Sequence, residues 1–92
     1  MLERNDLFHL PFYKKEAFTG SDRGVRFWIG KVEEEEKMSL QAIVWPEPFA
    51  LAHTEDEKKI KKDFPFSEEG LDLVYAWIMG EGRENIETAE VN

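Results

Sequence analysis

Two histidines, His9 and His53, are the side chains best suited to general acid–base catalysis. A hydrolytic site would need a nucleophile and an orienting group beside one of them, and neither histidine lies in a recognisable nucleophile motif. Histidine metal sites often space their ligands as H-x-H or H-x-x-x-H, and the chain has neither pattern. We therefore expect no catalytic residue, no metal site and no cofactor, and we expect that the protein is not an enzyme.

Four consecutive glutamates, Glu33 to Glu36 in the stretch VEEEEKM, form an unbroken row of carboxylates. Such a row suits a basic partner, because carboxylates can stand in for nucleic-acid phosphates, which are spaced ~3.4 Å apart per strand in DNA. It equally suits a solvated turn whose charges discourage edge-to-edge pairing of strands. A second acidic group, Glu68, Glu69 and Asp72, falls at the expected start of a helix, where acids are stabilising without any partner. Both interpretations stay open for both groups.

The segment TGSDRG superficially resembles an anion-binding glycine loop. A loop that cradles a phosphate opens onto the N-terminus of a helix. Here the next residues, VRFWI, have the pattern of a strand. The cluster Gly20, Ser21, Asp22 and Gly24 therefore predicts a turn between strands.

Composition indicates one small domain. The chain has 92 residues, which bury only a modest core, and its 41% hydrophobic and 13% aromatic residues exclude a disordered chain. It has no cysteine, which excludes disulfides and thiolate nucleophiles and suits a reducing cytosol. No apolar run approaches the ~20 residues of a membrane helix, and charges interrupt MLERNDLFHLPF, where a signal peptide is apolar. We expect a soluble, cytoplasmic protein.

The negative charge is concentrated in the last third of the chain. Residues 1–62 hold 12 acids and 11 bases, a net charge of −1, whereas residues 63–92 hold 8 acids and one base, a net charge of −7. A negative domain repels phosphates, so direct nucleic-acid binding is disfavoured. The dense basic cluster KKIKK has acids on both sides. We expect the partner to be a basic protein, one that itself binds nucleic acid, and we expect no membrane partner; the oligomeric state stays open.

Alternation of apolar and polar residues predicts strands over residues 24–32 and 37–45. Joined by the glutamates, they would form an antiparallel hairpin with the carboxylates at its tip. One face of this hairpin should line the core, with Val25, Phe27 and Ile29 on the first strand and Leu40, Ala42 and Val44 on the second. The opposite face carries Trp28, Ile43 and Trp45, which could form an exposed aromatic patch.

Weaker signals surround the hairpin. The segment PFYKKEAF, residues 11–18, suggests a further short strand, and FALAHT suggests either a strand or coil. Thr54 followed by Glu57 is a possible capping box for one or two helical turns. Residues 60–66, IKKDFPF, predict a last strand at a sheet edge, because Pro65 lacks a backbone donor.

The clearest helix spans SEEGLDLVYAWIMG, with Ser67 as N-cap and Gly80 as the stop. Its apolar face repeats at helical spacing, with Trp77 at the margin, and consists of Leu71, Val74, Tyr75 and Ile78. Gly70 lies inside this helix, where it costs up to ~1 kcal/mol relative to alanine.

These elements predict an α+β fold in two layers: an antiparallel sheet of three to four strands with one C-terminal helix packed across it. Residues 1–80 would form the single domain. Residues 81–92, RENIETAEVN with its preceding Glu81 and Gly82, are acidic and poor in apolar side chains, and we expect a frayed tail.

Three stretches, KEAFTGSDRGVRFWI, AIVWPEPFA and FPFSEEGLDLVYAWI, carry a resemblance that covers residues 12–80. The pattern F-T-G-S, W-P-x-P, F-S-x-E-G resembles that of a family of small acidic proteins from anaerobic Gram-positive bacteria and their conjugative mobile elements. Members are often labelled acetyltransferases of the GNAT type. GNAT enzymes hold acetyl-CoA with a Q/R-x-x-G-x-G/A loop that leads into a helix, and this chain has no such loop. We expect it not to bind acetyl-CoA.

Two classes of function follow. The first is a non-enzymatic acidic protein that binds a basic protein surface; the mobile-element setting implied by the resemblance sharpens it to a nucleic-acid mimic that inhibits a defence protein, as anti-CRISPR proteins do. The candidate residues are Glu33, Glu34, Glu35, Glu36, Glu68, Glu69 and Asp72. The second class is an accessory domain that binds a small ligand or a peptide through aromatic residues, Trp28, Trp45 and Trp77, of which Trp28 and Trp45 are the candidates for an exposed patch.

Overall fold

The computed structural model describes residues 3–22, 24–46 and 59–91, and of residues 87–91 it describes the backbone alone. Four strands form one antiparallel sheet in the order β1-β2-β3-β4: β1 Phe18–Asp22, β2 Val25–Glu34, β3 Lys37–Pro46 and β4 Ile60–Pro65. Two helices, α1 Glu68–Met79 and α2 Glu81–Val91, follow the sheet, and two short 3-10 helices, η1 Arg4–Asp6 and η2 Leu10–Lys14, precede it. The predicted α+β architecture is confirmed.

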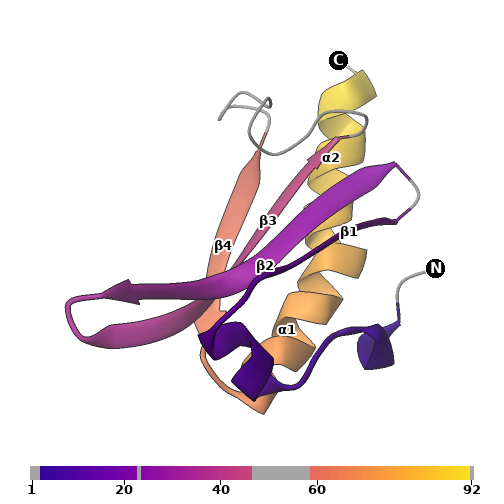
Figure 1. The fold of residues 1–92 in the computed structure, drawn as a ribbon. Coiled ribbons are helices and arrows are strands. Elements are labelled where there is room, and N and C mark those ends of the chain that lie inside the picture. Colours follow the sequence, from indigo (N-terminus) through magenta and orange to yellow (C-terminus); the bar gives the residue numbers. More distant parts are fainter. Residues whose placement is uncertain (1–2, 23, 47–58, 92) are drawn as a thin grey trace.

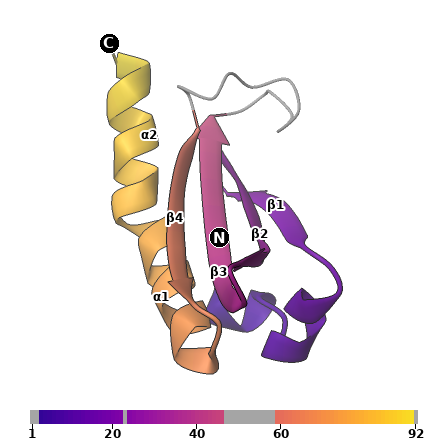
Figure 2. The same ribbon diagram turned by 90° about the vertical axis from the view of Figure 1, so that its left-hand side faces the viewer.

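The helices cover one face of the sheet (Figure 1), and the side view shows them as a separate layer (Figure 2). Helix α1 contacts β3 and β4, and α2 continues along the same two strands. The sequence at the end of the chain, from Ser67 onward, thus supplies the whole helical layer.

The predicted core faces of the hairpin are correct. Val25, Phe27 and Ile29 of β2 and Leu40, Ala42 and Val44 of β3 are all buried. They pack in one cluster with helix side chains: Leu71, Val74, Trp77 and Ile78 of α1, and Ile86 of α2. Tyr75, predicted on the buried face, is half-buried, and Trp77 takes its place in the core, where its ring lies edge-on to Phe64 of β4.

Helix α1 begins as its sequence predicts. The Ser67 side chain accepts a hydrogen bond from the backbone N–H of Gly70 (3.0 Å), which satisfies one of the free donors of the first turn. Gly70 is required here for packing, because a Cβ at this position would lie 1.8 Å from the backbone oxygen of Pro65. A glycine that is unfavourable for the helix alone therefore permits the close approach of α1 to the end of β4.

Gly70→Ala is expected to destabilise the protein by about 1–3 kcal/mol, the usual cost of overpacking a filled interior. The gain in helix propensity, up to about 1 kcal/mol, is too small to compensate, because the obstacle is a backbone carbonyl that cannot rotate away. Urea denaturation of the two proteins measures the difference. Glu69→Ala, at the exposed neighbouring position, is the control and should stay within about ±0.5 kcal/mol. A Gly70→Ala protein as stable as wild type would contradict this packing.

The first strand differs from the prediction. Residues Leu10–Lys14 form the 3-10 helix η2, with His9 as N-cap and Pro11 in its first turn, rather than part of a strand. The strand lies further along, over Phe18–Asp22, and pairs with β2 from Phe18↔Ile29 to Asp22↔Val25. The predicted turn is wrong for Gly20, Ser21 and Asp22, which belong to β1. Gly24, the last residue of that cluster, lies between β1 and β2 with a φ of 88°. The expectations for Thr54 and for FALAHT concern residues outside the described ranges.

The expectation of a frayed tail after Gly80 is wrong. Residues Glu81–Val91 form α2, and Ile86 is buried in the main core. Arg83 is buried as well, with a side-chain nitrogen 2.5 Å from the carboxylate of Asp22 in β1. The packing of Ile86 and this ion pair supply the tertiary contacts that the segment's own weak apolar pattern does not suggest.

Candidate protein-interaction site

The hairpin of β2 and β3 extends beyond the rest of the sheet. β1 pairs with β2 only as far as Ile29, and β4 pairs with β3 only from Ser39 onward. The intervening residues, 30–38, are called the arm below; they include the distal half of β2 and the turn. Figure 1 shows this part of the hairpin projecting away from the sheet and helices.

The arm carries all four glutamates of the central run. Glu33 and Glu34 end β2 and lie opposite Met38 and Lys37, and Glu35 and Glu36 form the turn between them. All four side chains are exposed. Lys31 forms an ion pair with Glu33 (Nζ–Oε1, 3.0 Å). With Lys31 and Lys37 counted, the arm holds four acids and two bases, a net charge of −2.

The turn has a backbone conformation that is unusual for its residues. Glu35 and Glu36 have φ values of 48° and 70°, and Glu34 and Lys37 pair across them. A two-residue loop with both φ values positive is a type I′ turn, which favours Asn-Gly because other side chains are strained there. Each glutamate therefore occupies the left-handed region at a cost of about 1–2 kcal/mol.

Replacing the turn by its preferred residues, Glu35→Asn with Glu36→Gly, is expected to stabilise the protein by about 1 kcal/mol, since it relieves part of that strain. Thermal unfolding followed by circular dichroism measures the change. The matched control is Glu35→Gln with Glu36→Gln, which removes the same two charges and keeps the strain. If the two double variants had equal stability, the left-handed turn would be contradicted.

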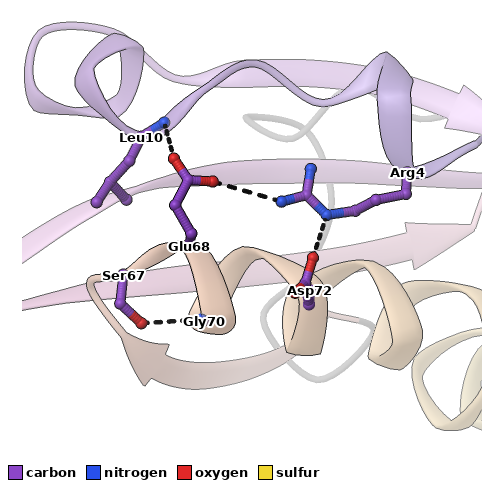
Figure 3. A network of polar contacts seen from close by, with 6 residues as sticks. All are labelled: Arg4, Leu10, Ser67, Glu68, Gly70 and Asp72. Atoms are coloured by element: carbon purple, nitrogen blue, oxygen red, sulfur yellow. Dashed lines mark hydrogen bonds and ion pairs between the residues drawn. The ribbon is translucent and has the colours of Figure 1, made fainter.

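The second acidic group makes contacts within the protein. Arg4 of η1 donates from Nε to the Asp72 carboxylate (2.6 Å), and one of its terminal nitrogens lies 3.6 Å from the Glu68 carboxylate. The other oxygen of Glu68 accepts a hydrogen bond from the backbone N–H of Leu10 (3.2 Å). Figure 3 shows this network joining the N-terminal segment to the first turns of α1. Glu69, the third residue of this group, has an exposed side chain.

The same network explains how the N-terminal segment is held on the core. Leu7 and Tyr13 are buried in the main cluster, and no sequence pattern singled out Arg4 or Tyr13. Burial raises the pKa of the Tyr13 hydroxyl above its ordinary value, an effect that the nearby Phe8 backbone and Arg4 partly offset. Glu68 and Asp72 thus have a structural role that needs no partner, as acids at a helix start often do.

The aromatic face of the hairpin is mostly covered. Trp45 is only 3% exposed and Ile43 only 7%. Trp28 is half-buried, and its ring lies over Gly30, where an added Cβ would be 2.4 Å from the ring. The expected exposed patch of Trp28 and Trp45 is therefore wrong for Trp45, which belongs to the interior.

A different aromatic group reaches the surface. Phe8 is 46% exposed; its ring stacks on Phe12 (centroids 4.1 Å apart) and lies edge-on to Phe18 (5.3 Å). Phe18 is the first residue of β1 and pairs with Ile29. This aromatic cluster, Phe8, Phe12 and Phe18, therefore lies where β1 leaves the side of β2 and the arm begins.

The described ranges contain no group of three or more His, Asp or Glu side chains arranged to hold a metal ion. His9 is exposed at the start of η2, and His53 lies outside the described residues. Within the described part of the chain, no helix is long and apolar enough to cross a membrane.

Comparison of the chain with protein-family models, with curated proteins and with solved structures finds no match.

Proposed function

We propose that this chain is a non-enzymatic, cytoplasmic interaction protein that binds a basic protein surface through its acidic arm. The observation that carries the proposal is the placement of Glu33 to Glu36. These exposed carboxylates lie on a part of the hairpin that neither β1 nor β4 accompanies. Glu68 and Asp72 are engaged with Arg4 and the backbone of Leu10, so they contribute less to such a surface.

The finer form of the proposal is a nucleic-acid mimic. A narrow two-stranded arm with carboxylates at its end could enter the phosphate-binding groove of a basic protein. If that protein is a defence protein, the arm would block its nucleic-acid site, as anti-CRISPR proteins do. The family resemblance in the sequence and the net charge of −8 support this form. The alternative, a ligand-binding domain that uses exposed tryptophans, is weakened because Trp45 is buried.

The test begins with recovery of a partner from host lysate at low salt. The quadruple variant Glu33→Gln, Glu34→Gln, Glu35→Gln and Glu36→Gln is then compared with wild type. We expect the variant to keep its stability within about ±0.5 kcal/mol, because all four side chains are exposed. We expect its association with the partner to be slower at low salt, with the difference shrinking at high salt, because charges near an interface act chiefly on the association rate.

The matched control is Glu69→Gln with Glu84→Gln, which removes exposed charges from the two helices and leaves the arm intact. Its association rate should stay close to that of wild type. Equal rates for wild type and the quadruple variant at both salt concentrations would show that the glutamates are a solvated turn, and the proposal for the arm would fail.

A further inference from the structure

Among the described residues, no strand pairs with the side of β2 that faces away from β3 beyond Ile29. In an antiparallel pair, successive residues of a strand direct their backbone N–H and C=O groups alternately to the two sides. Glu34 and Lys37 flank a two-residue turn, so their backbone groups form hydrogen bonds with each other. Every second residue of β2 counted back from Glu34, that is Val32 and Gly30, therefore also forms backbone hydrogen bonds with β3. Lys31 and Glu33 therefore direct their backbone groups to the opposite side.

The same alternation holds where β1 is present. Ile29, Phe27 and Val25 direct their backbone groups to that side and pair with Phe18, Gly20 and Asp22 of β1. β1 begins at Phe18, so its pairing with β2 stops at Ile29, and η2, which ends at Lys14, contacts β2 as a 3-10 helix rather than as a paired strand. Among the described residues, no backbone hydrogen bond outside the regular elements involves Lys31 or Glu33.

We propose that this edge, the outward backbone of Lys31 and Glu33, binds an extended basic segment of a partner protein as an added strand. The inference rests on the proposed function and deepens it: it specifies a peptide in β conformation as the basic element that the arm binds. An exposed strand edge is a template for such addition, and pairing with β3 keeps the backbone of this edge extended.

Charge and apolar contacts both favour a basic segment. An added strand would have Glu33, which also pairs with Lys31, beside one of its faces and Glu34 beside the other. Lysine or arginine on either face would therefore meet a carboxylate. The aromatic cluster of Phe8, Phe12 and Phe18 lies at the inner end of the edge and offers an apolar contact for the same segment. A second copy of the chain is disfavoured as occupant, because it would bring together two arms with a net charge of −2 each.

The probe is a short synthetic peptide of alternating lysine and valine, compared with the same peptide methylated on alternate backbone nitrogens. Both carry the same charge, but the methylated peptide cannot donate hydrogen bonds along one edge. We expect the unmodified peptide to bind at low salt and to slow the amide exchange of Lys31 and Glu33, measured by NMR. The amide exchange rates of Val32 and Glu34 should change little, because these amides already form hydrogen bonds to β3. The methylated peptide should bind about threefold to tenfold more weakly.

A matched pair of variants separates the contribution of the backbone N–H of Glu33 to peptide binding from that of its carboxylate. Glu33→Pro and Glu33→Gln lose the same carboxylate, but proline alone also loses the outward N–H, a change that an edge position tolerates. We expect peptide affinity to be about threefold to tenfold lower for Glu33→Pro than for Glu33→Gln. Equal affinities, with methylated and unmodified peptides binding alike, would overturn the added strand while leaving side-chain binding by the arm intact.

Two further outcomes would also overturn the inference. Failure of the unmodified peptide to bind would do so without affecting the proposed function, which is tested separately by the quadruple variant and the recovered partner. Sedimentation of the protein alone tests self-pairing: a dimer with protected Lys31 and Glu33 amides would assign the edge to a second copy of the chain.

Discussion

Val74→Asp is expected to unfold the protein. Val74 is fully buried in the middle of α1 and packs in the cluster that joins the helices to β2 and β3. A carboxylate placed there has no partner and costs several kcal/mol, which is a large part of the ~5–15 kcal/mol that stabilises a typical domain. Far-UV circular dichroism and urea denaturation should show loss of the cooperative transition.

The matched control is Leu73→Asp, which places the same carboxylate one residue earlier on the same helix. Leu73 is 51% exposed, so its replacement should change stability by no more than about 0.5 kcal/mol. The contrast separates the effect of burial from the effect of an added charge on an acidic helix. A Val74→Asp protein that folds cooperatively would show that α1 does not pack on the sheet through this face.

Arg83→Met is expected to destabilise the protein by about 3–5 kcal/mol, the usual cost of removing one partner of a buried ion pair. A terminal nitrogen of Arg83 donates to both the carboxylate and the backbone oxygen of Asp22, and both residues are more than nine-tenths buried. Methionine keeps much of the arginine's volume but leaves the Asp22 carboxylate without this guanidinium. Chemical denaturation at neutral pH measures the loss.

Two further variants define the origin of that loss. The double variant Arg83→Met with Asp22→Asn removes both charges and should recover part of the stability, since a neutral pair avoids the cost of a buried carboxylate. Glu84→Gln, next to Arg83 on the exposed side of α2, should have little effect. A loss below about 1 kcal/mol for Arg83→Met would contradict the anchoring of α2 to the end of β1.

The sequence by itself determined the elements whose signals are local. The period-two pattern of β2 and β3 predicted the hairpin and assigned Phe27 and Ala42 to the core, because a strand presents alternate residues to one face. The Ser67 cap and Gly80 stop predicted the ends of α1, because capping groups act within one turn. The position of the four glutamates at the hairpin tip followed from the same reasoning.

The tertiary structure decided the features that depend on residues far apart in the chain. Residues 81–91 have little apolar content, and their helix packs through Ile86 and through Arg83, whose partner Asp22 lies in the first strand. Glu68 and Asp72 form ion pairs with Arg4, which lies near the start of the chain. Trp45 is buried although its position in the pattern faces away from the helices. Periodicity predicts which face of an element a residue occupies. Whether that residue is buried, and which residue forms an ion pair with it, depends on which other element packs against that face.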